Sequence, residues 1–279
     1  KRQTEVITGV DGNQIMLFLH RPKQVGNSIP CIVHAHGGGM VLTSAADPLY
    51  VRWRNELARS GCLVIGVEFR NAAGQLGDHP FPAGLNDCAS ALQWANAKRT
   101  ALGVSNLLIS GESGGGNLAL ATVLKAKYDG WIEQIDGVFA LCPDISCKYL
   151  DAEPQLLSLK ENEGYIVDTS YLGPLLSRVY DPTGENARNP LAWPYYAEPS
   201  NLTGLPPHVI SVNELDPLRD EGLAYYRKLV AAGVPAVGRI VAGTPHGADI
   251  GLPDVIPEVF RATVSAVASF AKGIALQSR

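Results

Sequence analysis

The sequence has no long apolar run and no excess of positive charge. Glycine, proline or a charged residue interrupts every hydrophobic stretch early, whereas a helix that spans a bilayer needs roughly 20 apolar residues. The 23 Lys and Arg residues are outnumbered by 27 Asp and Glu residues, which gives a formal net charge of -4 and does not suit a phosphate backbone. We therefore expect a soluble, cytoplasmic protein that binds neither nucleic acid nor membrane. The sequence begins with Lys1 rather than methionine, which leaves open whether a leader or cap residues precede it.

Cysteine is scarce, and its five copies form no disulfide framework. An odd number cannot pair completely, and no C-x-x-C spacing of a zinc or redox site occurs. Most of the cysteines lie inside or beside apolar runs, which favours reduced thiols in the core. We expect no metal site. The five cysteines are Cys31, Cys62, Cys88, Cys142 and Cys147.

Short apolar runs recur along the chain and predict strands. Glu5 to Val10 and Gln14 to His20 flank Asp11-Gly12, a dipeptide that favours a tight hairpin turn. The later runs are almost continuously apolar, which suits strands buried on both faces of a parallel sheet. They are Cys31 to Ala35, Leu63 to Val67, Leu107 to Ile109, Val138 to Leu141, Val209 to Val212 and Val237 to Val241.

Helical spacing appears between these runs, after Pro82, from Asn117 to Lys127, after Asp220 and near the C-terminus. Strands that alternate with helices predict an α/β fold with a mostly parallel central sheet and helices on both faces. With 279 residues and 46% hydrophobic content, the chain suits one domain over residues 1–279. Residues 143–205 break the alternation, and we interpret them as a cap or lid insertion whose many aromatic residues argue against disorder.

A nucleophile motif occurs at Gly111-Glu112-Ser113-Gly114-Gly115, directly after one predicted strand and before a predicted helix. The pattern G-x-S-x-G in that context is typical of a sharp turn that exposes a strained serine at the edge of the sheet. The alternative is a glycine-rich turn that only caps the helix. We predict that Ser113 is a catalytic nucleophile at a helix N-terminus, where negative charge is stabilised.

A second glycine motif, His36-Gly37-Gly38-Gly39, follows the strand that begins at Cys31. Loops of this type supply backbone N–H donors to the oxyanion that forms when an ester carbonyl is attacked. We assign the oxyanion hole to Gly38, Gly39 and the amide of Gly114. A flexible linker is the alternative, although linkers rarely interrupt a strand-to-helix crossover.

A catalytic serine needs a general base and an acid that orients the base. In hydrolases with this nucleophile motif, the acid (Asp or Glu) follows the serine along the chain, and the His comes last. His208 and His246 come after Ser113; His208 leads into a strand, whereas His246 lies in the loop after the last strand. We predict His246 as the base. For the acid we prefer Asp216, which precedes a proline in the loop after Val209 to Val212, and keep Glu214 in reserve.

These motifs together resemble the hormone-sensitive-lipase family of esterases, over almost the whole chain. The resemblance implies the α/β-hydrolase fold, hydrolysis of short-chain acyl esters, no metal or organic cofactor and, by family habit, a homodimer. Further stretches are most similar to a bacterial member, which adds a macrocyclic lactone to the candidate substrates. Those stretches are Glu68-Phe-Arg-Asn71, His79-Pro-Phe-Pro82, Gly111-Glu-Ser-Gly-Gly-Gly-Asn-Leu-Ala119, Tyr180-Asp-Pro-Thr-Gly-Glu185 and Ala192-Trp-Pro-Tyr195.

The sequence departs from the family pattern in three places. Glu112 stands before the nucleophile where the family usually carries Asp, and Ala72 to Asp78 form a longer loop that we expect to reshape the pocket wall. The family places cap helices ahead of the first strands, whereas this sequence begins almost at the hairpin, so we expect a more exposed acyl pocket.

The substrate pocket is predicted from apolar residues near these motifs. Met40, Val41 and Leu42 follow the oxyanion loop, and Tyr149 and Tyr171 belong to the insertion. The alternative for these side chains is a place in the core.

The combined interpretation is a serine carboxylesterase that binds a small-molecule ester and works through an acyl-enzyme. An amidase or acyltransferase would use the same three residues. A non-catalytic small-molecule receptor on the same fold is the alternative of a different class. Such receptors tend to lose the base, whereas this chain has His246.

Overall fold

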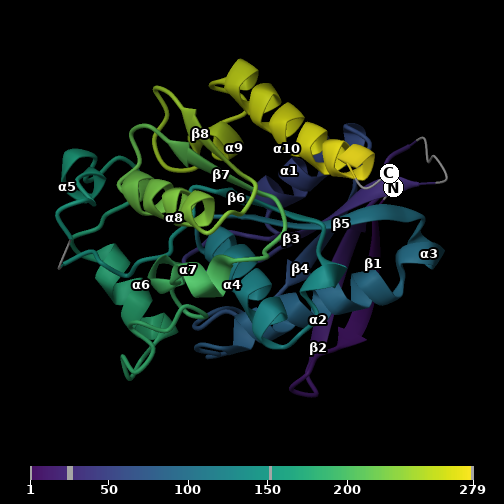
Figure 1. The fold of residues 1–279 in the computed structure, drawn as a ribbon, viewed down its shortest axis with the longest axis horizontal. Helices are drawn as coiled ribbons and strands as arrows, with labels where there is room; N and C mark the ends of the chain where they lie inside the picture. Colours follow the sequence, from purple (N-terminus) through teal and green to yellow (C-terminus); the bar gives the residue numbers. More distant parts are fainter. Residues whose placement is uncertain (1, 24–27, 151–152, 278–279) are drawn as a thin grey trace.

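The computed structural model describes residues 2–23, 28–150 and 153–277, which Figure 1 shows as a ribbon. In this part of the chain the strands form one eight-stranded sheet in the spatial order β1-β2-β4-β3-β5-β6-β7-β8. The pairs β1–β2 and β2–β4 are antiparallel, and the other neighbours are parallel. The strands are β1 (Arg2–Thr8), β2 (Gln14–His20), β3 (Ile29–Ala35), β4 (Leu63–Glu68), β5 (Val104–Glu112), β6 (Gly137–Leu141), β7 (His208–Asn213) and β8 (Ala236–Val241).

The mostly parallel α/β sheet predicted from the apolar runs is confirmed, and from β2 onward each predicted run lies within an observed strand. The first strand differs, because it ends at Thr8 rather than Val10. The turn begins at Gly9, whose N–H donates to the Asn13 carbonyl at 2.8 Å, and Gly12 adopts φ +78°. The turn therefore takes residues that the pattern had assigned to the strand.

Helices connect the strands and cover both faces of the sheet (Figure 1). None of those in the described residues is long and apolar enough to cross a membrane. The α-helices are α1 (Pro48–Arg59), α2 (Ala83–Ala97), α3 (Arg99–Leu102), α4 (Gly114–Tyr128), α5 (Ser158–Glu161), α6 (Leu172–Tyr180), α7 (Pro199–Leu202), α8 (Arg219–Ala231), α9 (Ala248–Gly251) and α10 (Pro257–Gln277). Two short 3-10 helices are η1 (Ile132–Gln134) and η2 (Pro194–Tyr196).

Alternate residues of the central strands enter two separate apolar cores, because successive side chains of a strand point to opposite faces. Ile32 of β3 packs in a core with residues of α1 and α10. Its neighbours Cys31 and Val33 pack in a larger core with residues of α2, α4 and α8. Each core buries one face of the sheet, which makes the sheet a rigid platform for the loops at its carboxyl edge.

The segment from residue 143 to 205 connects β6 to β7 and adds no strand among its described residues. Tyr180, Trp193 and Tyr195 are buried in the larger core, and the rings of Tyr180 and Trp193 meet edge to face at 5.4 Å. This segment is thus attached to the core through its own aromatic side chains. It carries α5 and α6 to one end of the molecule (Figure 1).

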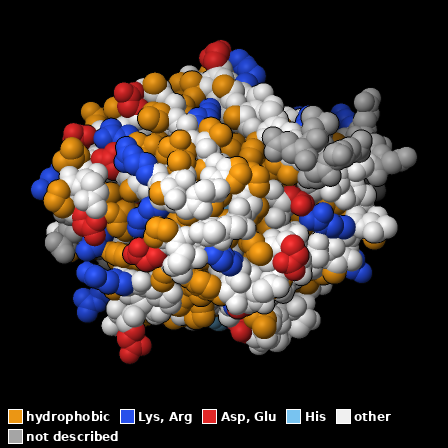
Figure 2. All heavy atoms as spheres, in the orientation of Figure 1, with side chains coloured by type: hydrophobic (Ala, Val, Ile, Leu, Met, Phe, Trp, Pro, Cys, Tyr) orange, Lys and Arg blue, Asp and Glu red, His pale blue; other side chains and the backbone are white. Residues whose placement is uncertain are grey.

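The surface is mixed in character. On the face that Figure 2 shows, Lys and Arg side chains alternate with Asp and Glu among apolar and uncharged groups. No single sign of charge dominates that face.

Candidate active site

Ser113 occupies the sharp turn between β5 and α4. Its backbone adopts φ +55° and ψ -123°, a region that non-glycine residues rarely enter and that costs of order 1–3 kcal/mol. The turn needs glycines on both sides of the serine. A Cβ on Gly115 would lie 2.1 Å from the Ala35 carbonyl oxygen, and a Cβ on Gly111 would lie 2.2 Å from the Gly115 carbonyl oxygen. The Ser113 N–H donates to the Leu141 carbonyl at 3.0 Å. The serine is thereby held at the N-terminus of α4.

The glycine loop after β3 lies directly against this turn. Gly38 and Gly39 adopt φ +104° and +64°, conformations that glycine tolerates without steric cost. A Cβ on Gly114 would lie 2.7 Å from the Gly39 nitrogen, so the two amide-bearing segments are in contact. The amides of Val41 and Leu42 both donate to the Gly38 carbonyl and close the loop as a tight turn. The Gly39 and Gly114 amides assigned to an oxyanion hole therefore lie in adjoining segments next to Ser113, and Gly38 lines the same cavity as Ser113.

His246 and Asp216 come from the loops after β8 and β7, and they form a hydrogen bond of 2.8 Å between Nδ1 and Oδ2. Asp216 is fully buried, and its Oδ1 accepts the Leu218 N–H at 2.9 Å. A carboxylate accepts from Nδ1–H, which leaves Nε2 of the neutral ring free to take a proton. Burial lowers the pKa of His246, but the charge and hydrogen bond of Asp216 outweigh it, so this pKa lies above the ordinary 6.5.

The alternative acid and base have other roles. Glu214 is exposed, and its carboxylate accepts the Gly243 N–H at 2.6 Å. His208 is buried in β7, where Nδ1 donates to the Pro206 carbonyl at 2.6 Å and burial lowers its pKa to about 4. His36 is buried in a stack with the Phe69 ring at 4.2 Å, with a pKa lowered to about 3. These groups are structural.

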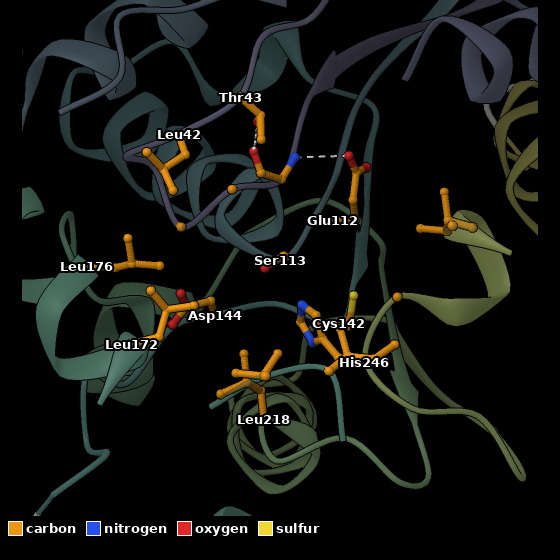
Figure 3. Close-up of a pocket in the computed structure, with 18 of the residues that line it drawn as sticks. Leu42, Thr43, Glu112, Ser113, Cys142, Asp144, Leu172, Leu176, Leu218 and His246 are labelled. Atoms are coloured by element: carbon orange, nitrogen blue, oxygen red, sulfur yellow. Dashed lines mark hydrogen bonds between the residues drawn. The ribbon is translucent and has the colours of Figure 1, made fainter. Parts of the chain in front are cut away.

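Ser113 and His246 line one cavity of about 400 Å³ at the carboxyl edge of the sheet. In Figure 3, Ser113 lies near the centre, with His246 and Cys142 to one side and Asp144, Leu172 and Leu176 to the other. Most of the wall is apolar. The aliphatic residues that line it are Leu42, Leu49, Ile166, Val167, Leu172, Leu176, Leu218, Ala248, Ile250 and Leu252.

The structure places two of the five predicted wall residues in the cavity lining and three elsewhere. Leu42 and Tyr149 line the cavity. Met40 and Val41 do not; both are 2% exposed in the larger core, because the tight turn after Gly38 directs them inward. Tyr171 is 72% exposed and also lies outside the lining, so its prediction as a wall residue is wrong.

One group of potential metal ligands occurs in the described residues, formed by Cys142, Asp216 and His246 with ligand atoms within 4.8 Å of one another. Two of these groups are already bonded to each other. Burial raises the pKa of the Cys142 thiol well above its ordinary value, which disfavours the thiolate that metals bind.

The comparisons with known proteins agree with this geometry. A family model described as the alpha/beta hydrolase fold matches residues 32–250. The chain belongs to this family. Among solved structures, brefeldin A esterase, described as a bacterial homologue of human hormone-sensitive lipase, is 46% identical with a TM-score of 0.97, over 99% of this chain and 78% of that one. The α/β-hydrolase fold and the hormone-sensitive-lipase resemblance predicted from the sequence are confirmed.

Two curated α/β-hydrolase relatives are esterases by name. The chain is 31% identical over 228 residues to an arylesterase of Saccharolobus solfataricus, across 80% of this chain and 69% of that protein. It is 32% identical over 241 residues to the carboxylesterase NlhH of Mycobacterium tuberculosis, across 84% of this chain and 71% of that protein.

Glu112, one departure from the family pattern, supports the glycine loop after β3 of this α/β-hydrolase. Its Oε1 accepts the Gly37 N–H at 3.0 Å, and its Oε2 accepts from His34 Nε2 at 2.8 Å (Figure 3 shows the first bond). His34 is fully buried and Glu112 is 6% exposed. The sequence marked this position as unusual, but its contact with the glycine loop depends on how β3 and β5 pair.

The longer loop at residues 72–78 is the other departure, and its expected effect on the pocket wall is wrong. None of these residues lines the cavity. Instead, the amides of Ala72 and Ala73 donate to the carbonyls of Met40 and Val41 at 2.9 and 3.2 Å. The loop therefore supports Met40 and Val41, the two residues that follow the glycine loop.

Proposed function

We propose that this α/β-hydrolase is a serine carboxylesterase that works through an acyl-enzyme at Ser113. The observation that carries the proposal is the shared cavity: a strained serine, gathered backbone amides and a histidine bonded to a buried aspartate all meet there. Esterase is the activity named for the relatives. Ser113, His246 and Asp216 are the proposed catalytic triad.

The first half-reaction transfers the acyl group to the enzyme. Ser113 Oγ attacks the ester carbonyl while His246 Nε2 takes its proton. The carbonyl oxygen becomes an oxyanion, which accepts hydrogen bonds from the amides of Gly38, Gly39 and Gly114. The C–O bond to the alcohol then breaks, and His246 returns the proton to the departing alkoxide. Asp216 stabilises the imidazolium and keeps its own charge.

The second half-reaction releases the acid. Water gives a proton to His246 Nε2 and attacks the acyl carbon, and the oxyanion forms again at the same amides. The bond to Ser113 Oγ breaks, the proton returns to the serine, and the carboxylic acid leaves.

The cavity suits a small apolar substrate. Its volume of about 400 Å³ lies in the range of small-molecule sites, roughly 300–1,000 Å³, and its wall is mostly aliphatic. We propose short-chain acyl esters as substrates, and a lactone as a further class that the relation to brefeldin A esterase supports. Ring opening of a lactone uses the same steps and gives one hydroxy acid.

The test is the release of p-nitrophenol from p-nitrophenyl acetate in the first turnover. A fast phase that matches the enzyme concentration, followed by slower steady release, is expected for the wild type and absent in Ser113→Ala. Hydrolysis that survives in Ser113→Ala would refute the proposal. Adding an alcohol acceptor separates an acyltransferase, which would form the transesterified product in preference to the acid.

A further inference from the structure

Asp144 is a carboxyl group in the cavity wall that the hydrolytic mechanism does not use. It follows β6, is 7% exposed and lines the same cavity as Ser113. Its N–H donates to the Ser113 carbonyl at 3.2 Å, and its own carbonyl accepts from Asn117 Nδ2 at 2.8 Å. These two bonds fix its backbone to the nucleophile turn and to α4. The side chain therefore sits at a defined distance from the reacting serine.

Tyr149 holds the Asp144 side chain in place. The phenol donates a hydrogen bond to Asp144 Oδ1. Burial raises the pKa of Tyr149 well above its ordinary value, so the phenol keeps its proton. The ring lies against α6 at Gly173, where a Cβ would come within 2.8 Å of the ring carbon Cδ1. Gly173 thus makes room for the ring that orients Asp144.

Asp144 keeps an acceptor for a ligand. Among the residues that the structure describes, Tyr149 gives the only hydrogen bond to its carboxylate, and this bond goes to Oδ1. Figure 3 shows the carboxylate beside Leu172, on the opposite side of Ser113 from His246 in that view. Its second oxygen, Oδ2, is therefore available on a wall that is mostly apolar.

The other two carboxylates on the wall differ from Asp144. Glu112 bonds to Gly37 and His34. Asp168 accepts from the amides of Ser170 and Tyr171 at 2.9 and 2.7 Å and so holds the turn that precedes α6. Glu112 thus uses both of its oxygens, and Asp168 uses only Oδ1 but is less buried than Asp144. Among the described residues, Asp144 is therefore the buried wall carboxylate with an unbonded oxygen.

The surroundings favour a neutral polar partner over a cation. Burial raises the pKa of Asp144 against the opposing effects of Tyr149 and His246, and a buried carboxyl is costly to keep charged. A substrate hydroxyl can donate to the ionised carboxylate or accept from the protonated acid. An ammonium group suits only the ionised form. A hydroxyl therefore fits in either protonation state.

We propose that Asp144, oriented by Tyr149, is a hydrogen-bonding subsite for a hydroxyl group of the substrate. The enzyme then prefers hydroxylated esters or lactones over equally large apolar ones. This inference rests on the proposed esterase function of the same cavity. A buried polar group that loses its partner is penalised, and a site built to bond a hydroxyl rejects the analogue that lacks it.

The test compares pairs of substrates in which a methyl group replaces the hydroxyl. On the acyl side, p-nitrophenyl 3-hydroxybutyrate is paired with p-nitrophenyl 3-methylbutyrate. On the alcohol side, 2-hydroxyethyl butyrate is paired with propyl butyrate. The readout is the ratio of kcat/KM for the hydroxylated over the apolar ester in each pair, corrected for hydrolysis without enzyme.

In at least one pair, this ratio is expected to be about tenfold or more higher in the wild type than in Asp144→Leu. Asp144→Asn, which keeps an acceptor and a donor, retains part of the preference. Tyr149→Phe keeps the ring against Gly173 but removes the orienting bond, and it lowers the ratio by a smaller factor. Leu42→Ala is the matched wall control, expected to change both rates of a pair alike.

Ratios that are equal in the wild type and Asp144→Leu for both pairs would overturn the subsite, provided that Asp144→Leu still hydrolyses the apolar esters. If Asp144→Leu does not fold, as circular dichroism would show, an unchanged ratio in Tyr149→Phe and Asp144→Asn overturns it instead. Failure of the esterase function itself looks different, because the wild type would then hydrolyse neither ester of a pair faster than Ser113→Ala.

Discussion

Removing the Glu112 side chain tests whether the oxyanion loop is held by this carboxylate. In Glu112→Ala, the buried Gly37 N–H and His34 Nε2 lose their acceptor. A hydrogen bond to a charged group contributes about 1.5–3 kcal/mol, so the two together are worth about 3–6 kcal/mol. We expect the variant to lose at least about 3 kcal/mol of unfolding free energy. The glycine loop should then relax away from Ser113.

The catalytic effect follows from the loop's position. Gly37 precedes the two glycines whose amides are assigned to the oxyanion, and loss of one such donor costs about a hundredfold to a thousandfold in kcat. We expect kcat of Glu112→Ala to fall about a hundredfold, with little change in KM, because the oxyanion exists only in the transition state.

Two milder variants distinguish the effect of the Glu112 charge from the effect of its side-chain length. Glu112→Gln keeps a carbonyl oxygen for Gly37 but loses the charge, and we expect roughly a tenfold fall in kcat. Glu112→Asp restores the family's usual residue and the charge, but a side chain shorter by one methylene cannot keep both bonds, at 3.0 and 2.8 Å. We expect its kcat to lie between those of the Gln and Ala variants.

The assay is steady-state hydrolysis of p-nitrophenyl butyrate together with urea unfolding followed by circular dichroism. The reasoning fails if Glu112→Ala keeps kcat within about threefold of the wild type, because the expected effect of losing an oxyanion donor is far larger than that.

Three further predictions follow from the same geometry. Ser113→Gly relieves the φ +55° strain and should raise the unfolding free energy by about 1 kcal/mol while abolishing activity; an unchanged or lower midpoint in thermal unfolding would count against strain at this turn. Because His246 must be neutral to act as base, kcat/KM should rise with pH through a pKa above 6.5. Asp216→Asn leaves burial as the main influence on this pKa, so it should lower kcat at least about a thousandfold and move the rise of the remaining activity to lower pH. A rise at the same pH in the variant would show that Asp216 does not set the pKa of His246. Gly115→Ala places a Cβ 2.1 Å from the Ala35 carbonyl oxygen and should abolish soluble expression or activity, and full activity with normal stability would show that the backbone there can move freely.

The strand predictions are confirmed because their evidence was local, and the motif predictions concern local sequence as well. Buried parallel strands are recognisable because both faces are apolar, and the nucleophile motif is recognisable because a turn between strand and helix needs glycines at fixed positions around Ser113. The chain order of Ser113, Asp216 and His246 added the rest of the proposed triad, and the structure brings these residues to one edge of the sheet.

The pocket wall was predicted less well because it depends on where turns point. Met40 and Val41 follow the oxyanion glycines and are apolar, yet a tight turn sends them into the core. Tyr171 belongs to the segment that faces the cavity, but it precedes α6 and points outward, whereas Leu172 and Leu176 line the wall. Apolar and aromatic side chains at neighbouring positions thus end in three different environments: the core, the solvent and the cavity wall.

The sequence alone determined the α/β architecture and the candidates for nucleophile, base, acid and oxyanion amides, because each depends on residue type and on spacing to the nearest strand. Only the tertiary structure decided the role of Glu112, the wall of the cavity and the free oxygen of Asp144. Those features arise where segments far apart in the chain meet, and their contacts follow from how strands pair and helices pack rather than from any local pattern.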